Sequence, residues 1–215
     1  MELPHSKLLF LNKLKQELRK KVKKNDVLYV ECNLIKILHN TKYQIQIFIL
    51  EKIFKILSDS VGPNGTIITP SFTYCLDSSS NRRVFDLEKA NSTCGVFSQF
   101  IIKFKKHIRT HDPMFSCLIL GKILKKKINE IDSSFGEKSI FKYLYQKDAK
   151  LLNIGTESFD PTFLHYVEQF YDHNYEKILY RKKYYRHGLI RTRKKIFKKR
   201  FEFFLKCQNY NYNFK

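Results

Sequence analysis

The stretch that decides the fold runs from VLYVEC at residues 27–32 to GTIITPSF at residues 65–72. Each end is a short apolar run rich in β-branched residues, as buried strands are. Between them, residues 42–57 carry apolar side chains at helical spacing and lead into the turn-forming sequence SDSVGPNG. A strand, a helix and a strand in this order predict two parallel strands joined by a helical crossover.

The same alternation continues toward both ends of the chain. Further helices are expected at residues 6–24, 96–104, 139–146 and 162–171, and further strands at residues 115–121 and 150–154. We therefore predict the α/β class, with a three-layer α/β/α sandwich around a mainly parallel central sheet. Because ligands bind beyond the carboxyl ends of the strands in such sheets, the segments that follow the strands should carry the chemistry.

The composition fits a folded protein in a reducing compartment. Of the 215 residues, 43% are hydrophobic, which excludes a disordered chain. No apolar run approaches the roughly 18–20 residues of a membrane-spanning helix, and the first residues lack the pattern of a secretion signal. The five cysteines are scattered, without the paired spacing of a zinc site. We expect reduced thiols, no bound metal and a cytoplasmic location.

The chain is strongly basic, with 41 Lys and Arg against 20 Asp and Glu. Residues 177–206 alone hold thirteen cations and one acid, Glu202. We divide the chain into a domain at residues 1–175 and a basic, aromatic extension at residues 176–215, which is expected to be helical because its apolar residues recur near helical spacing. This helix would either contact phosphates or a membrane surface, or pack its apolar side while its lysines face water.

Three segments that follow expected strands stand out, namely TPSFTY at residues 69–74, RTHDPMFS at residues 109–116 and NIGTESFDPTFLHYVEQ at residues 153–169. Neither common pattern of Gly-rich phosphate loop is present, which leaves NTP hydrolysis and dinucleotide redox chemistry unsupported. A G-x-S-x-G nucleophile elbow is absent as well, so the usual hydrolase signature is missing.

Together with VLYVECNLIKIL at residues 27–38 and VGPNGTIITPSFTY at residues 61–74, these segments resemble the aminoglycoside 3-N-acetyltransferase family. Members of that family use acetyl-CoA to acetylate an amine of an amino sugar. The similar motifs occur in the family's order over residues 5–190. The resemblance implies the family's α/β/α sandwich, acetyl-CoA as acyl donor and a small-molecule amine as acceptor.

The resemblance implies that His165 is the general base, since the family has a catalytic histidine in this L-H-x-x-E setting. An amine is nucleophilic only after it loses a proton, and a histidine with a pKa near ~6.5 can accept that proton. Glu168 lies three residues later on the same helix face and would orient the imidazole. The alternative is that His165 only packs the start of a helix while Glu168 is solvated.

Four more residues are expected to contact the acyl donor, acetyl-CoA. Thr73 would line the thioester, where its hydroxyl or a nearby N–H group can donate to the oxygen that gains charge, and Ser71 would contribute similarly. The alternative for Thr73 is a residue that simply ends a strand. Arg109 and Ser116 match the family's arginine and serine, which implies places at the cofactor, with Arg109 reaching a phosphate of coenzyme A.

Two sites depart from the family pattern. Asp112 stands where much of the family has histidine, next to His111, which indicates a changed acceptor pocket. After the first strand the family has small residues, whereas this chain has Glu31, Cys32 and Asn33. Glu31 would repel the phosphates of the cofactor if it faced them.

We therefore expect an acetyl-CoA-dependent N-acetyltransferase that acts on an aminoglycoside or an amino sugar. A net charge of +21 favours an anionic, nucleotide-linked amino sugar over a polycationic aminoglycoside. No specific nucleic acid partner is expected, and the oligomeric state stays open. Two alternatives remain: an inactive family descendant with an altered turn at residues 31–33, or a nucleic-acid or membrane-surface binding protein that acts through its basic tail.

Overall fold

The computed structural model describes residues 3–75, 84–122, 128, 130–156, 162–167, 181–193 and 195–206, with the backbone alone at residues 181–187 and 201–206. Its central sheet has the strand order β4-β5-β2-β1-β6. The strands of this sheet are β1 Val27–Cys32, β2 Thr66–Pro70, β4 Ile108–Arg109, β5 Cys117–Gly121 and β6 Lys150–Ile154. The four strands that the sequence predicts are thus confirmed, and β4 is added to them.

β4, β2, β1 and β6 of this sheet point the same way, and β5 runs against them. β1 pairs in parallel with β2 and β6, whereas β5 runs antiparallel to both β2 and β4. The α/β class is confirmed, and the sheet is mostly parallel but mixed, because β5 is antiparallel to both of its neighbours. The reason is the connection between β4 and β5 at residues 110–116, which is shorter than the dozen or so residues of a crossover, so the chain turns straight back.

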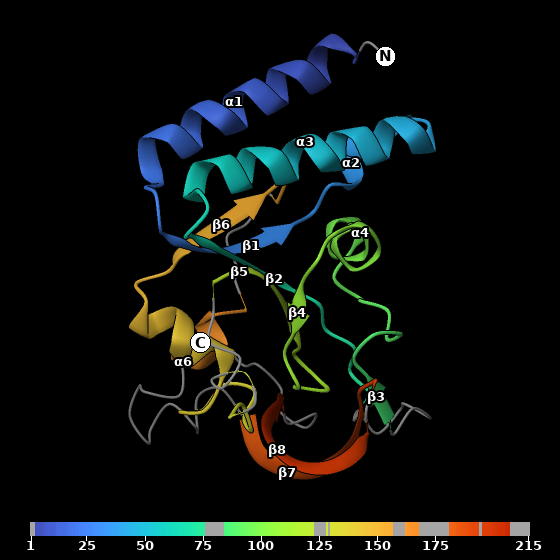
Figure 1. Ribbon diagram of the computed structural model, residues 1–215, viewed down its shortest axis with the longest axis vertical. Helices are drawn as coiled ribbons and strands as arrows, with labels where there is room; N and C mark the ends of the chain where they lie inside the picture. Colours follow the sequence, from blue (N-terminus) through green and yellow to red (C-terminus); the bar gives the residue numbers. More distant parts are fainter. Residues whose placement is uncertain are drawn as a thin grey trace, which may run out of the picture.

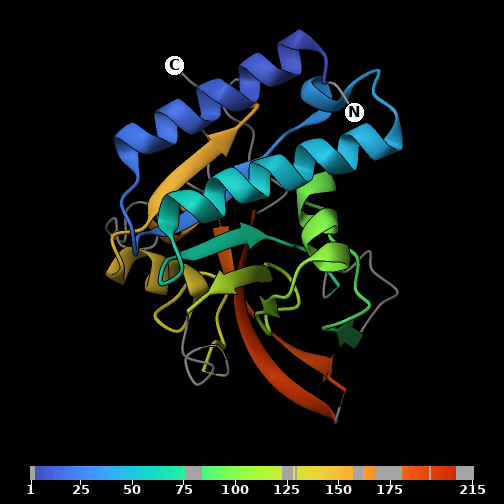
Figure 2. The same ribbon diagram turned by 45° about the horizontal axis from the view of Figure 1, so that its top comes forward.

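A helix is present at each of the five expected places, and the short helix α2 Ile35–Leu38 is added to them. The helices are α1 His5–Lys21, α2 Ile35–Leu38, α3 Tyr43–Val61, α4 Val96–Phe104, α6 Ile140–Gln146 and α7 Leu164–Val167. Of the helix expected at residues 162–171, the part after residue 167 lies outside the described residues. Figures 1 and 2 show α1 and α3 side by side across one face of the central sheet. Within the described part of the chain, no helix is long and apolar enough to cross a membrane.

Side chains alternate between the two faces of each strand, so the sheet has a separate hydrophobic core on each face. Leu28 and Val30 of β1 point to the side of α1, α3 and α4, where they join a mainly aliphatic cluster. Tyr29 points to the opposite side and meets the Phe141 ring of α6 at 5.7 Å. This second cluster is rich in aromatic rings and includes Tyr166 of α7. It therefore joins α6 and α7 to the same face of the sheet.

Where the structure describes the C-terminal extension, it is a hairpin, so the helical prediction for residues 176–215 is wrong. β7 Arg181–Arg191 and β8 Ile196–Lys206 pair antiparallel, and β3 Val84–Asp86 adds to β7 in parallel. The hairpin curves at the end of the molecule opposite α1 and α3 (Figure 1). Its aromatic and β-branched residues favour strands, and the edge of β3 supplies backbone partners that helical spacing alone does not reveal.

Candidate active site

A cavity of about 580 Å³ opens at the carboxyl ends of β1, β2 and β6. Ligands bind at this edge in sheets with parallel strands, and the sequence predicted the chemistry there. The cavity is lined by Glu31, Cys32, Asn33, Ile35, Lys36, Pro70, Cys94, Asn153, Gly155, Thr156 and Thr162. Residues at the ends of β1, β2 and β6, and in the segments that follow β1 and β6, therefore surround the same cavity.

The backbone segments that follow β1 and β6 are in direct contact at the cavity wall. The Asn33 N–H donates to the Ile154 carbonyl oxygen at 2.8 Å, which carries the pairing one step past β1. Gly155 follows with a φ of 77°, and a β-carbon at this position would lie 2.1 Å from the Asn33 carbonyl oxygen. Only glycine permits both this backbone conformation and this close approach.

Glu31 connects β1 to the segment that leads into α7. Its carboxylate accepts a hydrogen bond from the Thr162 N–H at 3.1 Å. The Thr162 carbonyl oxygen in turn accepts from the His165 N–H at 3.1 Å. The carboxylate that the sequence presented as a source of repulsion toward coenzyme A therefore holds the start of α7 at the cavity.

His165 is not one of the described residues that line the cavity; it follows the lining residue Thr162 by three positions and packs on the aromatic face of the sheet. Its half-buried ring meets Phe135 edge to face, with centroids 5.3 Å apart and planes at 90°. Phe135 contacts Phe115 at 4.7 Å, and Phe115 contacts Phe72 at 5.1 Å. A continuous row of rings thus joins His165 to the segment after β2. Its expected partner Glu168 lies outside the described residues.

The two hydroxyl residues expected at the thioester differ in their contacts. The Thr73 hydroxyl donates to the Pro113 carbonyl oxygen at 2.6 Å, and the Thr73 N–H donates to the Met114 carbonyl oxygen at 3.2 Å. Ser71 is fully buried, and its Oγ has no hydrogen-bond partner in the described structure. The free hydroxyl of this segment is therefore that of Ser71, whereas the donors of Thr73 are engaged within the chain.

Arg109 is buried and holds three segments together. Its Nη2 donates to the Ser71 carbonyl oxygen at 2.8 Å, its Nε donates to the Ser116 hydroxyl at 3.2 Å, and its Nη1 donates to the Ala90 carbonyl oxygen. The guanidinium also lies 5.1 Å from the centre of the Phe85 ring. Burial lowers the pKa of Arg109 to about 10. Each donor group of this guanidinium is thus used inside the protein, away from the phosphate contact that the sequence suggested.

Ser116 belongs to the same buried network. Its side chain is fully buried, and its hydroxyl donates to the Ser71 carbonyl oxygen while accepting from Arg109. The Ser116 carbonyl oxygen also accepts from the Ser71 N–H at 2.7 Å. Ser116 therefore fixes the end of β2 against the start of β5.

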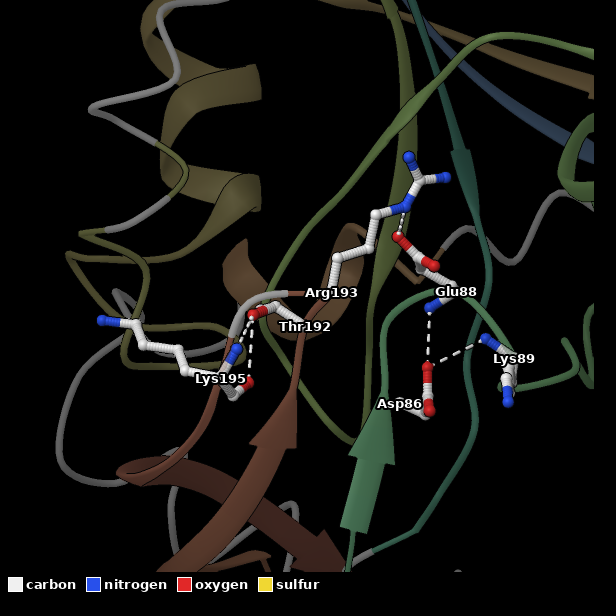
Figure 3. A network of polar contacts seen from close by, with 6 residues as sticks. All are labelled: Asp86, Glu88, Lys89, Thr192, Arg193 and Lys195. Carbon is white, nitrogen blue, oxygen red and sulfur yellow. Dashed lines mark hydrogen bonds and ion pairs between the residues drawn. The ribbon is translucent and has the colours of Figure 1, made fainter.

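Polar contacts tie the C-terminal hairpin to the turn after β3 (Figure 3). Asp86 Oδ1 accepts from the N–H groups of Glu88 and Lys89, both at 3.1 Å, and the Arg193 guanidinium pairs with the Glu88 carboxylate. Thr192 and Lys195 close the hairpin turn through hydrogen bonds of 2.9–3.1 Å. The turn after β3 leads along the chain to Ala90 and Cys94, so the hairpin supports one wall of the cavity.

The loop between β4 and β5 contains the residue that departs from the family pattern. Asp112 is buried, and its carboxylate accepts from the N–H groups of Met114 and Phe115 at 2.8 and 3.0 Å. Burial raises the pKa of Asp112. The neighbouring His111 ring packs against Phe197 of β8 at 5.7 Å, and burial together with Lys199 lowers its pKa. Asp112 thus shapes a turn, and His111 is a contact with the hairpin.

Asn153 is a cavity residue that the sequence reasoning missed. Its Oδ1 is buried and has no hydrogen-bond partner in the described structure. The signal in the sequence was a polar side chain inside the apolar strand KLLNI. An acceptor without a partner is unfavourable in a protein interior, so its presence beside a cavity is a reason to look for a ligand donor.

The cavity wall also contains two thiols, Cys32 and Cys94. Burial raises the pKa of both thiols, which keeps them protonated and unreactive near neutral pH. Among the described residues, no group of three or more His, Cys, Asp and Glu side chains is placed to hold a metal ion. The described wall therefore offers polar side chains, and its two thiols are not reactive.

The sequence is that of an acetyltransferase family. The sequence model of the aminoglycoside 3-N-acetyltransferases matches residues 49–212, and the chain belongs to that family. A search of curated proteins gave no match. Because the match extends to residue 212, it includes the C-terminal hairpin, which is part of the family's sequence pattern.

Solved structures of such enzymes have the same fold at low sequence identity. AAC-IIIb, solved in a binary complex with CoASH, superposes with a TM-score of 0.69 at 19% identity over 89% of this chain and 74% of that one. AAC-VIa with bound sisomicin gives 0.66 at 17% identity, with coverages of 89% and 74%. The YokD protein from Bacillus subtilis gives 0.62 at 19% identity, with coverages of 87% and 74%.

Proposed function

We propose that this protein transfers the acetyl group of acetyl-CoA to an amine of an amino sugar. The observation that supports this most is the cavity at the carboxyl ends of β1, β2 and β6, with α7 held at its rim by the hydrogen bond from Thr162 to Glu31. Family membership supports the reaction class. The related fold of AAC-IIIb with CoASH supports the acyl donor.

The residues of the wall fit such a donor. Lys36 provides a cation for a phosphate group, and Thr156 and Thr162 provide hydroxyls. Asn153 Oδ1 provides an acceptor for a ligand N–H, which the amide-rich arm of coenzyme A or the acceptor amine can donate. When bound, acetyl-CoA supplies an activated thioester.

In the proposed reaction, His165 takes a proton from the acceptor amine. The amine nitrogen forms a bond to the acetyl carbon while the bond from that carbon to sulfur breaks, and the electron pair of the broken bond leaves with the thiolate. The proton stays on the imidazole until the thiolate or solvent takes it. The edge-to-face contact with Phe135 orients the ring. We assign Glu168 the role of stabilising the imidazolium.

The segment after β2 supports the thioester in this proposal. The free Ser71 hydroxyl is the preferred donor to the acetyl oxygen, since the hydroxyl of Thr73 is engaged with Pro113. Thr73 keeps the segment against the β4–β5 loop. We give Arg109 and Ser116 the role of positioning Ser71, in place of direct cofactor contact.

The charge of the site supports an anionic acceptor over a polycation. Among the described residues of the cavity wall, the one acid is Glu31, which is engaged with Thr162, and Lys36 adds a positive charge. The field of the whole chain has the same sign. We therefore prefer a nucleotide-linked amino sugar to an aminoglycoside such as sisomicin as the acceptor.

A thiol-release assay tests the proposal. The intact chain with acetyl-CoA is compared on sisomicin and on nucleotide-linked amino sugars, and His165→Ala should lower kcat/KM by about 10²–10⁴-fold. His39→Ala, at an exposed position outside the site, is the matched control and should leave the rate unchanged. A rate that His165→Ala leaves intact contradicts the role of His165. Absence of coenzyme A binding in calorimetry favours an inactive descendant, and salt-dependent binding of DNA without transfer favours the basic-tail alternative.

A further inference from the structure

A larger hollow, which shares no described lining residue with the cavity of the candidate site, lies between the two helices that cover the aliphatic core. It has a volume of about 1040 Å³ and is formed by α1, α3 and the loop after α1. Figure 2 shows these two helices running side by side on the outside of the fold. The proposed acetyl transfer makes no use of this groove.

The floor and mouth of the groove are apolar. Leu11 of α1 is buried at its base, and Leu8 at its mouth is 47% exposed. The half-buried side chains of Phe48 and Ile56 form the α3 wall. Apolar surface in a concave site is favourable to cover, which is how hydrophobic grooves bind their partners.

The rim of the groove is cationic. Lys15 and Arg19 project from α1, Lys52 and Lys55 from α3, and Lys24 from the following loop. Among the described lining residues the single acid is Asp59, whose carboxylate pairs with Lys55 at 3.1 Å. An occupant of this groove must therefore combine an apolar stripe with flanking negative charge.

The length of the groove defines the size of the occupant. Its α1 wall runs from Leu8 to Val22 and its α3 wall from Phe48 to Ser60. At about 1.5 Å per residue these walls extend for roughly 20 Å, which corresponds to a helix of three to four turns.

We propose that this groove binds an acidic, amphipathic helix of a partner protein. Such a helix places its apolar stripe on Leu8, Leu11 and Phe48 and its carboxylates beside the rim cations, a known mode of peptide recognition. A second copy of this chain fits poorly, because the net charge of +21 opposes self-association. A flat bilayer does not fill a concave groove, and a nucleic acid gains little from an apolar floor.

The test uses the full chain and a fluorescein-labelled peptide of about 16 residues, with Leu on one helical face and Glu on the others. Fluorescence anisotropy should give saturable binding in the micromolar range that weakens with added salt. The double variant Lys15→Glu/Arg19→Glu should weaken this binding at least about tenfold. Lys13→Glu/Lys21→Glu makes the same change of charge on α1 outside the groove and should stay within about twofold of the parent.

Three results would overturn the proposal. The first is no binding up to about 1 mM peptide, and the second is equal loss of affinity in both double variants. The third is equal binding of a peptide in which Lys replaces Glu. If only vesicles of anionic lipid bind, and both double variants weaken that binding equally, the surface is a membrane contact instead. Acetyl transfer is measured in the same variants and should be unchanged, so failure here is distinct from failure of the proposed reaction.

Discussion

The Glu31 carboxylate and the Thr162 backbone N–H, 131 positions apart in the chain, are joined by a hydrogen bond of 3.1 Å. One end of this bond belongs to β1, which lies between the parallel strands β2 and β6, and the other to the turn that starts α7. The bond thereby sets where His165 lies relative to the cavity.

Glu31→Ala should therefore release α7 without unfolding the sheet. A hydrogen bond to a charged group contributes roughly 1.5–3 kcal/mol, and partial exposure of Glu31 lowers this to about 1 kcal/mol in the free energy of unfolding. Glu31→Gln keeps an acceptor oxygen and should lose less. Urea denaturation measures the stability, and amide exchange at Thr162 and His165 reports on α7. Unchanged exchange in Glu31→Ala contradicts the link.

Arg109→Met should be strongly destabilising. The substitution removes the Arg109 donors to the carbonyl oxygens of Ser71 and Ala90 and to the Ser116 hydroxyl, at a cost of about 3 kcal/mol or more, although Ser116 still donates to Ser71. Arg109→Lys should recover only part of this, because an ammonium cannot reach three acceptors with a planar fork. Thermal or urea unfolding measures both variants. Arg19→Met, at an exposed position, is the control and should stay within about 0.5 kcal/mol of the parent.

Asp112→Asn should change the pH dependence of stability. Burial raises the pKa of Asp112 in the folded state above its ordinary value of 3.8. The folded protein then binds more protons than the unfolded chain between these two pKa values, so the parent loses stability as pH rises through this window. Asn keeps an acceptor for the N–H groups of Met114 and Phe115 but does not titrate.

The variant should therefore gain stability relative to the parent as pH rises above about 4 and through the raised pKa of Asp112. Urea unfolding of both proteins at several pH values measures this difference. A difference that stays constant across the series would show that the carboxylate titrates as it does in the unfolded chain.

Asn153→Leu should raise the stability of the protein while it weakens substrate binding. Removing a buried acceptor that has no partner should raise the free energy of unfolding by about 1 kcal/mol, provided that the larger side chain fits at the cavity. The same change removes a ligand contact and should raise KM in the thiol-release assay. Gly155→Ala is the contrasting variant, since its β-carbon would meet the Asn33 carbonyl oxygen and should destabilise the protein. A stabilised Asn153→Leu with unchanged KM rules out the proposed contact.

Sequence alone predicted the elements whose signals are local. The apolar runs at residues 27–32, 66–70 and 117–121 and the helical spacing in residues 43–61 could be interpreted without knowledge of their partners, because period and turn chemistry act over a few residues. The order of the motifs in those elements was enough to identify the family, and it predicted the edge of the sheet at which the cavity opens.

Tertiary structure decided the features that depend on distant partners. β3 at residues 84–86 pairs with residues 189–191, and this edge turned an expected helix into a hairpin. Burial turned Arg109 from an expected phosphate ligand into a buried contact between three segments, and it left Ser71, not Thr73, with the free hydroxyl. Hydrogen-bond partners are set by which segments the fold brings within about 3 Å, and residue type by itself does not contain that information.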